Sequence, residues 1–193
     1  MAGHSNYTAL LDACVLYPIV TCDALLRLAS QGLYAPKWSR RIETEWLSNL
    51  LVARPELEGK LEYRRGCMRE AVPDWEVSEQ AISSLIPSLN LPDEKDRHVL
   101  AAAIVGHADC IVTANLKDFP DDVLACFGIE AVHPDTFIIS QWDLFQVQTI
   151  AAFKTMRAGW RRPEATAEDF AAAFDRGGLP ATALRLRDAA ELI

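Results

Sequence analysis

The sequence lacks the features of several common protein classes. Its longest apolar stretches are far shorter than a membrane span, and residues 1–7 show no basic segment followed by an apolar run. Neither a GxGxxG nor a GxxxxGK phosphate-binding loop occurs. We therefore expect a protein that spans no membrane, works in the cytoplasm and does not hold a nucleotide on a glycine-rich loop.

Cysteine is scarce and is not spaced for metal or redox chemistry. No two cysteines form a CxxC pair, which excludes a zinc knuckle or a thioredoxin-type motif. Their number is odd and most lie in apolar segments, which indicates buried thiols in a reducing compartment. No base accompanies a Ser or Cys nucleophile in the sequence. The five residues are Cys14, Cys22, Cys67, Cys110 and Cys126.

Basic residues are fewer than acidic residues. The chain has 19 Lys and Arg against 27 Asp and Glu, a net charge of −8, which argues against a general binder of the phosphate backbone. A nuclease that binds metal through carboxylates is still compatible, because the metal supplies the positive field. With 193 residues, 50% of them hydrophobic, the chain can form one well-packed domain and a small appendage.

Hydrophobic patterning predicts an α/β domain followed by helices. Short apolar strands alternate with amphipathic helices up to about residue 134, which indicates a mostly parallel sheet. Beyond that point only helical patterns occur, so we predict a domain at 6–135 and a helical extension at 136–193. Strands are expected at 8–12, 33–36, 110–113 and 130–132, and helices at 20–31, 39–51, 55–71, 78–85, 93–106, 121–127, 135–159, 166–176 and 180–192, with a break at 161–163.

Several acids occupy positions that favour apolar residues. Asp12 interrupts an apolar run at the end of the first strand. Glu45 and Asp96 lie on the apolar faces of helices 39–51 and 93–106. Carboxylates are rarely buried unless they are paired or bind a metal, so this pattern indicates a shared site.

Three further polar residues follow the same logic. Asp93 lies one turn before Asp96 on the same side, and Asn115 and Asp118 follow the strand 110–113. Because ligands bind at the carboxyl ends of parallel strands, these groups can meet in one pocket that suits Mg²⁺ or Mn²⁺. Taken singly, each acid also has a structural interpretation, such as a helix cap at Asp93 or Asp118, or an ion pair with Arg40 or Arg41 for Glu45.

Taken in order, four segments resemble the PIN domain, and in particular VapC-type toxin ribonucleases of bacterial toxin–antitoxin pairs. The segments are 10–16, 39–47, 93–103 and 111–120, and the C-terminal helices resemble an extension found in one branch of these toxins. The resemblance implies a PIN-like three-layer α/β/α fold and an endoribonuclease that uses Mg²⁺ or Mn²⁺. It also implies an RNA substrate, an antitoxin partner and a homodimer.

The resemblance assigns roles to the acids. Asp12, Glu45 and Asp96 correspond to the first three acids of the family, and Asp93 is a candidate accessory ligand. The fourth acid is replaced by Asn115, with Asp118 three residues later, and either residue can complete the site. Thr113 is a candidate for orienting the attacking water or a ligand.

Other residues extend the prediction to the substrate. Lys37, Arg40 and Arg41 surround Trp38 at the start of a helix, which suits single-stranded RNA, although an ordinary exposed helix start explains them equally well. His98 is expected to point away from Asp96. The C-terminal apolar residues are expected to pack on the main domain, with partner binding as the alternative. A non-catalytic RNA- or protein-binding module with a degenerate metal site is the competing functional hypothesis, and a phosphatase or DNA nuclease is a third.

Overall fold

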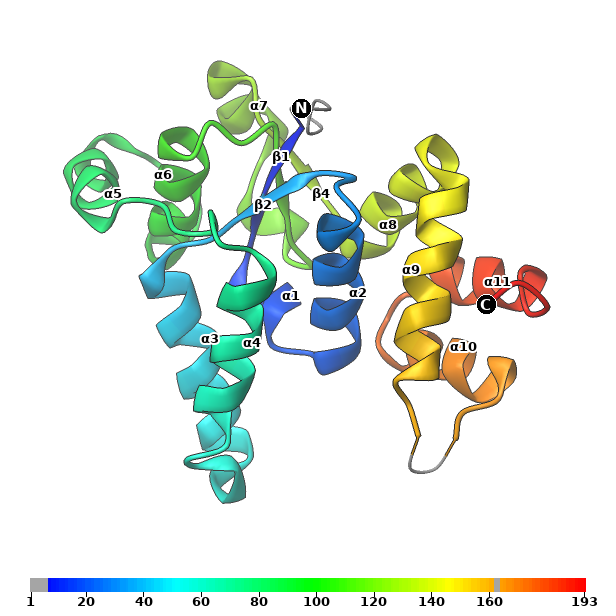
Figure 1. The fold of residues 1–193 in the computed structure, drawn as a ribbon. Helices are drawn as coiled ribbons and strands as arrows, with labels where there is room; N and C mark the ends of the chain where they lie inside the picture. The colour runs from blue at the N-terminus through cyan, green and yellow to red at the C-terminus, as the bar shows by residue number, and fades with distance from the viewer. Residues whose placement is uncertain (1–6, 162–163) are drawn as a thin grey trace.

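A four-stranded parallel sheet forms the centre of the protein (Figure 1). The structure is a computed structural model that describes residues 7–161 and 164–193. The strands are β1 (Thr8–Leu11), β2 (Ala35–Lys37), β3 (Cys110–Val112) and β4 (Glu130–Val132), in the spatial order β2-β1-β3-β4. Every neighbouring pair is parallel, so the predicted mostly parallel sheet is confirmed.

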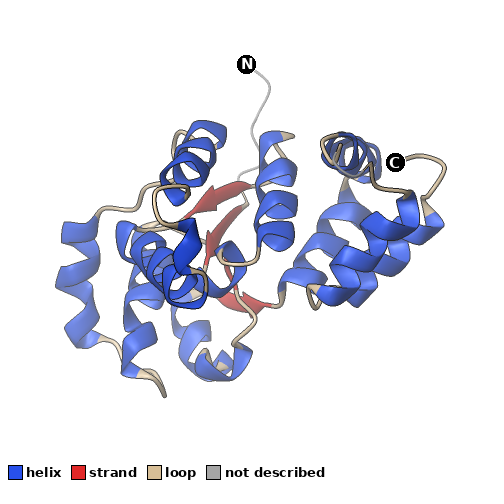
Figure 2. Cartoon of the chain, turned by 90° about the horizontal axis from the view of Figure 1, so that it is seen from below, coloured by secondary structure: helices blue, strands red, loops and turns tan. Residues whose placement is uncertain are grey.

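Helices cover both faces of the sheet, which gives the expected three layers (Figure 2). Each parallel connection crosses over through helices, and the right-handed rule places α2 on one face and α6 and α7 on the other. Within the main domain the helices are α1 (Ala13–Leu16), α2 (Ile19–Ser30), α3 (Arg40–Ala53), α4 (Leu61–Ala71), α5 (Glu79–Leu85), α6 (Arg97–Val105) and α7 (Asp121–Leu124). Short 3₁₀ turns connect them: η1 (Pro55–Leu57), η2 (Ile86–Ser88), η3 (Glu94–Asp96), η4 (Leu116–Asp118) and η5 (Ala125–Phe127).

The central strands are buried on both sides. Leu10 and Leu11 of β1 and Ile111 of β3 are completely inaccessible to solvent. Their near-continuous apolar sequences are typical of strands covered by helices on both faces. Within the described residues, no helix is both long and apolar enough to cross a membrane.

Four helices follow the sheet; the first three contact α2, and the fourth packs on the outer side of this group (Figure 1). Phe153 forms the centre of their shared core, with its ring 5.3 Å from Trp142 and 5.6 Å from Phe174. Both Phe170 and Phe174 are fully buried, but their ring partners Phe153 and Trp160 belong to the extension itself. The expected packing on the main domain is seen where α10 contacts α2, whereas Leu184 is exposed. The helices are α8 (Pro134–Leu144), α9 (Gln146–Ala158), α10 (Ala167–Arg176) and α11 (Pro180–Asp188).

Several predicted helices are interrupted. The helix expected at 55–71 is divided at Gly59, whose φ of +78° suits glycine and ends the first turn. The helix expected at 135–159 is divided at Phe145, which has φ −135° and ψ 55°. The predicted break at 161–163 lies partly outside the described residues, as does residue 6, the predicted start of the main domain.

Asp135 attaches the last helix to the main domain. Its carboxylate accepts hydrogen bonds from the amides of Ala181 and Thr182, both at 2.8 Å, and from the Thr182 hydroxyl at 2.6 Å. These amides belong to the first turn of α11, whose N-terminus attracts negative charge. A buried side chain from α8 therefore caps a helix 46 residues further along the chain.

We expect Asp135→Ala to lower the free energy of unfolding by about 2–4 kcal/mol, because it leaves three donors, two of them on buried Thr182, without an acceptor. The matched control is Asp143→Ala, which removes an exposed ion pair with Arg185 and should change stability by less than about 1 kcal/mol. Urea unfolding measures both. Equal stability of the two variants would contradict the assigned role of Asp135.

Candidate active site

The candidate site lies where β1 and β3 end side by side. The chain leaves β1 toward β2 on one side and later returns to β3 on the other, so the two strands flank the point where the strand order reverses. Such a switch point is where open parallel sheets bind ligands at their carboxyl ends. Asp12 directly follows β1 and Thr113 directly follows β3, as the sequence predicts.

Asp12 is held tightly at this edge. Only 5% of the residue is exposed, and one carboxylate oxygen accepts the Ala13 amide at 2.6 Å. The other oxygen accepts the Thr113 hydroxyl at 2.7 Å and the Cys14 thiol at 3.1 Å. Burial raises the pKa of Asp12, while the hydrogen bonds from Cys14, Thr113 and Ala13 oppose that rise. The contacts fix the direction of the carboxylate.

Cys14 belongs to the site, although the sequence analysis gave it no role there. Its sulfur accepts the Ala114 amide at 3.2 Å and lies 3.4 Å from the Thr113 hydroxyl. Burial raises the pKa of the thiol to about 12, so it stays protonated and donates to Asp12. The side chain therefore links the ends of β1 and β3 and is not a nucleophile.

Asp96 is surrounded by the other acids. It precedes α6, yet its side chain makes no capping hydrogen bond to that helix. Its pKa is raised to about 6, first by burial and then by the negative charges of four neighbours, which are Asp12, Asp93, Asp118 and Glu45. The structure thus brings each of these four acids within electrostatic range of Asp96.

Glu45 projects from α3 toward α6 and contacts His98. The Nε2 of His98, which was expected to point away from Asp96, lies 3.3 Å from the Glu45 carboxylate. Nδ1 lies 2.6 Å from the Lys95 carbonyl. Burial lowers the pKa of His98, but Glu45 and the Lys95 carbonyl raise it and prevail. When both ring nitrogens of His98 carry a proton, the ring is positively charged and pairs with Glu45.

The two candidates for the fourth position differ in their surroundings. Asn115 is exposed, and its backbone N–H donates to the Thr113 hydroxyl at 3.0 Å. Asp118 ends the turn η4, is partly buried and contributes to the raised pKa of Asp96. Asp118 is therefore the residue whose charge reaches the acidic cluster. Asp93 is exposed and caps η3 through the Lys95 amide at 2.9 Å, as its structural interpretation proposed.

The three basic residues near Trp38 form ion pairs with acidic side chains. Lys37 lies 2.7 Å from Asp74. Arg40 and Arg41 pair with Glu76 and Glu79 at 2.5 and 3.0 Å. A contact of these residues with RNA stays a prediction, and such a contact would have to compete with these ion pairs.

The donor set of the site suits a hard divalent cation. No three His, Cys, Asp or Glu side chains are arranged closely enough to hold a metal among residues 7–161 and 164–193. Mg²⁺ does not need such a cage, since it retains several waters and binds proteins through one or two carboxylates. The carboxylates around Asp96 repel one another, and a cation relieves that repulsion.

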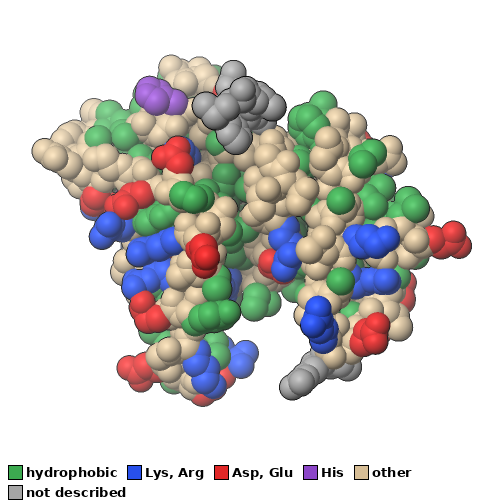
Figure 3. Space-filling model, viewed as in Figure 1, with side chains coloured by type: hydrophobic (Ala, Val, Ile, Leu, Met, Phe, Trp, Pro, Cys, Tyr) green, Lys and Arg blue, Asp and Glu red, His purple; other side chains and the backbone are tan. Residues whose placement is uncertain are grey.

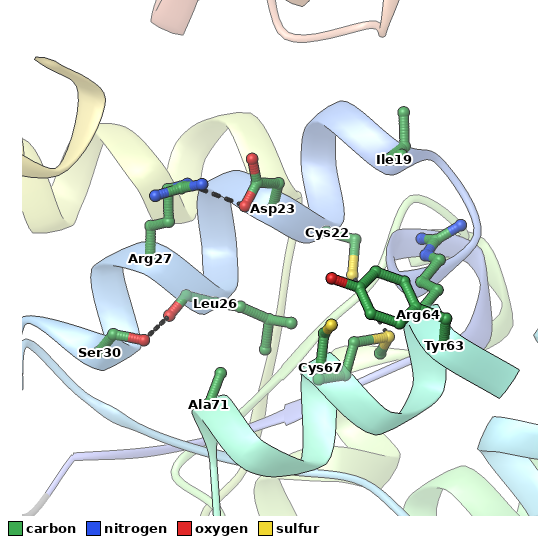
Figure 4. A pocket seen from close by; sticks show the side chains of 11 residues that line it. Ile19, Cys22, Asp23, Leu26, Arg27, Ser30, Tyr63, Arg64, Cys67 and Ala71 are labelled. Carbon is green, nitrogen blue, oxygen red and sulfur yellow. Dashed lines mark hydrogen bonds and ion pairs between the residues drawn. The ribbon is translucent and has the colours of Figure 1, made fainter. Parts of the chain in front are cut away.

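A second concavity lies between α2 and α4, away from these acids (Figure 4). It has a volume of about 490 Å³ and a mostly apolar lining that includes Leu26, Tyr63 and Met68. Asp23, an acid in this lining, forms an ion pair with Arg27 at 2.8 Å. A lining of this kind does not support phosphodiester chemistry, so we place the reaction at the acidic edge of the sheet.

Comparison with known proteins agrees with the fold. A family model described as a PIN domain matches residues 8–117, more than half of the chain. The chain belongs to the PIN-domain family. A second model, the VapC50 C-terminal domain, matches residues 134–188, which include α8 to α11.

A curated relative supports the assignment over a shorter segment. The "Putative ribonuclease VapC50" of Mycobacterium tuberculosis (strain ATCC 25618 / H37Rv) is 53% identical over 62 residues. That segment covers 32% of this chain and 37% of the relative, so the match spans little more than a third of the relative's length. No solved structure matches the chain.

We expect an NMR titration in EDTA to give Asp96 a pKa of about 6, against its usual value of 3.8. Asp93→Asn should lower the pKa because it removes one neighbouring charge, whereas the distant Asp122→Asn should not. Folded Asp96 binds its proton more tightly than unfolded Asp96, so stability falls as the pH rises from about 4 to 6. A pKa of Asp96 at its usual value would contradict its burial among these acids.

Proposed function

We propose that this protein is a metal-dependent endoribonuclease, the toxin of a toxin–antitoxin pair, which hydrolyses RNA phosphodiesters in the cytoplasm. The observation that carries the proposal is a buried carboxylate, Asp12, held by the Thr113 hydroxyl where β1 and β3 of a PIN domain end. The pKa of Asp96, raised first by burial and then by neighbouring acids that include Asp12, supports the same place. The match to a putative ribonuclease supports the same activity.

Each residue has a distinct part in the proposed reaction. Asp12 and Asp96 would hold Mg²⁺ or Mn²⁺, with Glu45 and Asp118 as further ligands. Bound there, the cation activates a water for attack and neutralises charge on the phosphate. Thr113 fixes the direction of the Asp12 carboxylate, since its hydroxyl donates to that group. His98 restrains Glu45.

Secondary roles complete the proposal. Asp93 acts as an accessory acid, and Asn115 takes a carbonyl or water-mediated contact at the fourth position. Lys37, Arg40 and Arg41 guide RNA toward the start of α3 if the substrate displaces their partners. The main domain is taken as 6–135 and the helical extension as 136–193. The resemblance to VapC toxins motivates a cognate antitoxin and a homodimer as partners.

One alternative has a specific observation in its favour. No three potential ligands are arranged as a ready-made metal cage among the described residues, and position 115 is an amide. A non-catalytic RNA- or protein-binding module with a degenerate metal site has these properties. Mn²⁺ titration by calorimetry separates the two: heat that disappears in Asp96→Asn supports the nuclease.

We expect the purified protein to cleave RNA in the presence of Mg²⁺ or Mn²⁺, and we expect EDTA to stop this cleavage. Asp12→Asn should lower the cleavage rate at least about 100-fold, because it removes a carboxylate that holds the cation. The control is Asp122→Asn, which changes an exposed acid on α7 and should cleave like the parent. Denaturing gel electrophoresis of a labelled RNA measures the rate.

Two outcomes would decide against the proposal. Cleavage that survives both EDTA and Asp12→Asn would exclude the metal mechanism. Tight RNA binding without Mn²⁺ uptake or cleavage would favour the binding module instead.

A further inference from the structure

We propose that the C-terminal extension carries a second RNA contact. Three basic residues, Lys154, Arg157 and Arg161, together form what we name the α9 cationic stripe, and we assign it to the phosphate backbone of single-stranded RNA. The inference rests on the proposed function, since it gives the same substrate an additional binding surface.

The stripe lies on the outer side of α9. The opposite side of this helix is buried in the core through Ala152, Phe153 and Met156. Lys154 and Arg157 are one helical turn apart, and Arg161 follows the end of the helix. All three line one concavity of about 510 Å³. On this face of the molecule, basic side chains are visible over the C-terminal helices (Figure 3).

These cations differ from most others in the protein because no acid pairs with them within the described residues. By contrast, Arg185 and Arg187 of the same extension are both engaged with carboxylates. Glu164 lines the concavity and offsets part of the charge. Three cations against this acid leave a positive surface that can accept phosphates.

Trp160 supplies the second element of a single-strand surface. It lines the concavity and is half-buried, with its ring packed edge-on against Phe170 at 5.0 Å and 75°. A partly exposed indole beside cations offers a base a stacking surface while the cations bind phosphates. Such a combination fits single-stranded RNA better than an acidic protein segment, which has no bases to stack.

The distribution of charge along the chain favours the same location. Residues 136–193 contain seven Lys or Arg and seven Asp or Glu, so the net charge of −8 belongs to residues 1–135. The main domain therefore carries a net charge that disfavours RNA, and its cations near Trp38 are paired. The extension lacks this net repulsion, and its unpaired stripe attracts the substrate.

The test compares two variants with the same change in charge. Lys154→Gln/Arg157→Gln removes two cations of the stripe. Arg54→Gln/Lys60→Gln, the control, removes two exposed cations between α3 and α4. Both are made in full-length Asp12→Asn protein, and circular dichroism verifies folding. Fluorescence anisotropy measures binding of an unstructured 12-nucleotide RNA from 50 to 300 mM KCl.

We expect the stripe variant to bind RNA about 10- to 30-fold more weakly at 0.1 M salt. Its plot of log affinity against log salt should be shallower by about 1.4, since each lost phosphate contact contributes roughly 0.7 on a single strand. The control should match its parent in slope and differ little in affinity.

Equal slopes for the stripe variant and the control would overturn the inference. So would stripe-dependent binding of a polyglutamate peptide without binding of RNA, which would identify an acidic protein as the partner. Cleavage by the unmutated protein is assayed separately. If EDTA stops cleavage but the stripe variant binds RNA like the control, only this inference is refuted. If RNA binding depends on the stripe but no cleavage occurs, only the proposed nuclease activity is refuted.

Discussion

Crowding of negative charge at one edge of the sheet is the constraint on which the rest of the structure depends. Asp12 is almost completely buried, and the hydrogen bonds from Ala13, Cys14 and Thr113 offset part of the cost of burying its charge. Further acids from α3 and from the turns η3 and η4 approach the same place. Such an arrangement is unfavourable for the isolated protein, and it persists because the surrounding core positions the backbone.

The charges outside this edge are arranged in two ways. On the main domain, cations at the start of α3 pair with acids of the segment 74–79, which stabilises the surface and reduces its net field. On the extension, the residues along α9 remain unpaired within the described chain. An acidic body and a neutral extension with a basic stripe together restrict where a polyanion can approach.

The sequence was informative where the physics is local. Asp12 and Thr113 lie at the ends of apolar runs that form strands. The helix expected at 39–51 is observed as α3, which Ser39 caps by accepting the Ile42 amide at 3.2 Å. A regular helix was expected from residue 93, whereas residues 94–96 form a 3₁₀ turn, which has fewer residues per turn and changes which side chains share a face.

Other features depend on contacts between distant segments. The pairing of Arg40 with Glu76 spans 36 residues and leaves no periodic signal in the sequence. The contribution of Cys14 required the position of Ala114, which only the pairing of β1 with β3 provides. The four-residue helix α1 is too short for a hydrophobic period to reveal.

The hydrogen bond between Thr113 and Asp12 joins residues 101 positions apart. Their strands are neighbours, so the edge cannot assemble until β3 has been synthesised and has paired with β1. Non-local pairing of this kind forms late, after a large loop has closed. A chain still emerging from the ribosome therefore lacks the complete acidic edge through the first half of its translation, so nothing that requires this edge can act before β3 is in place.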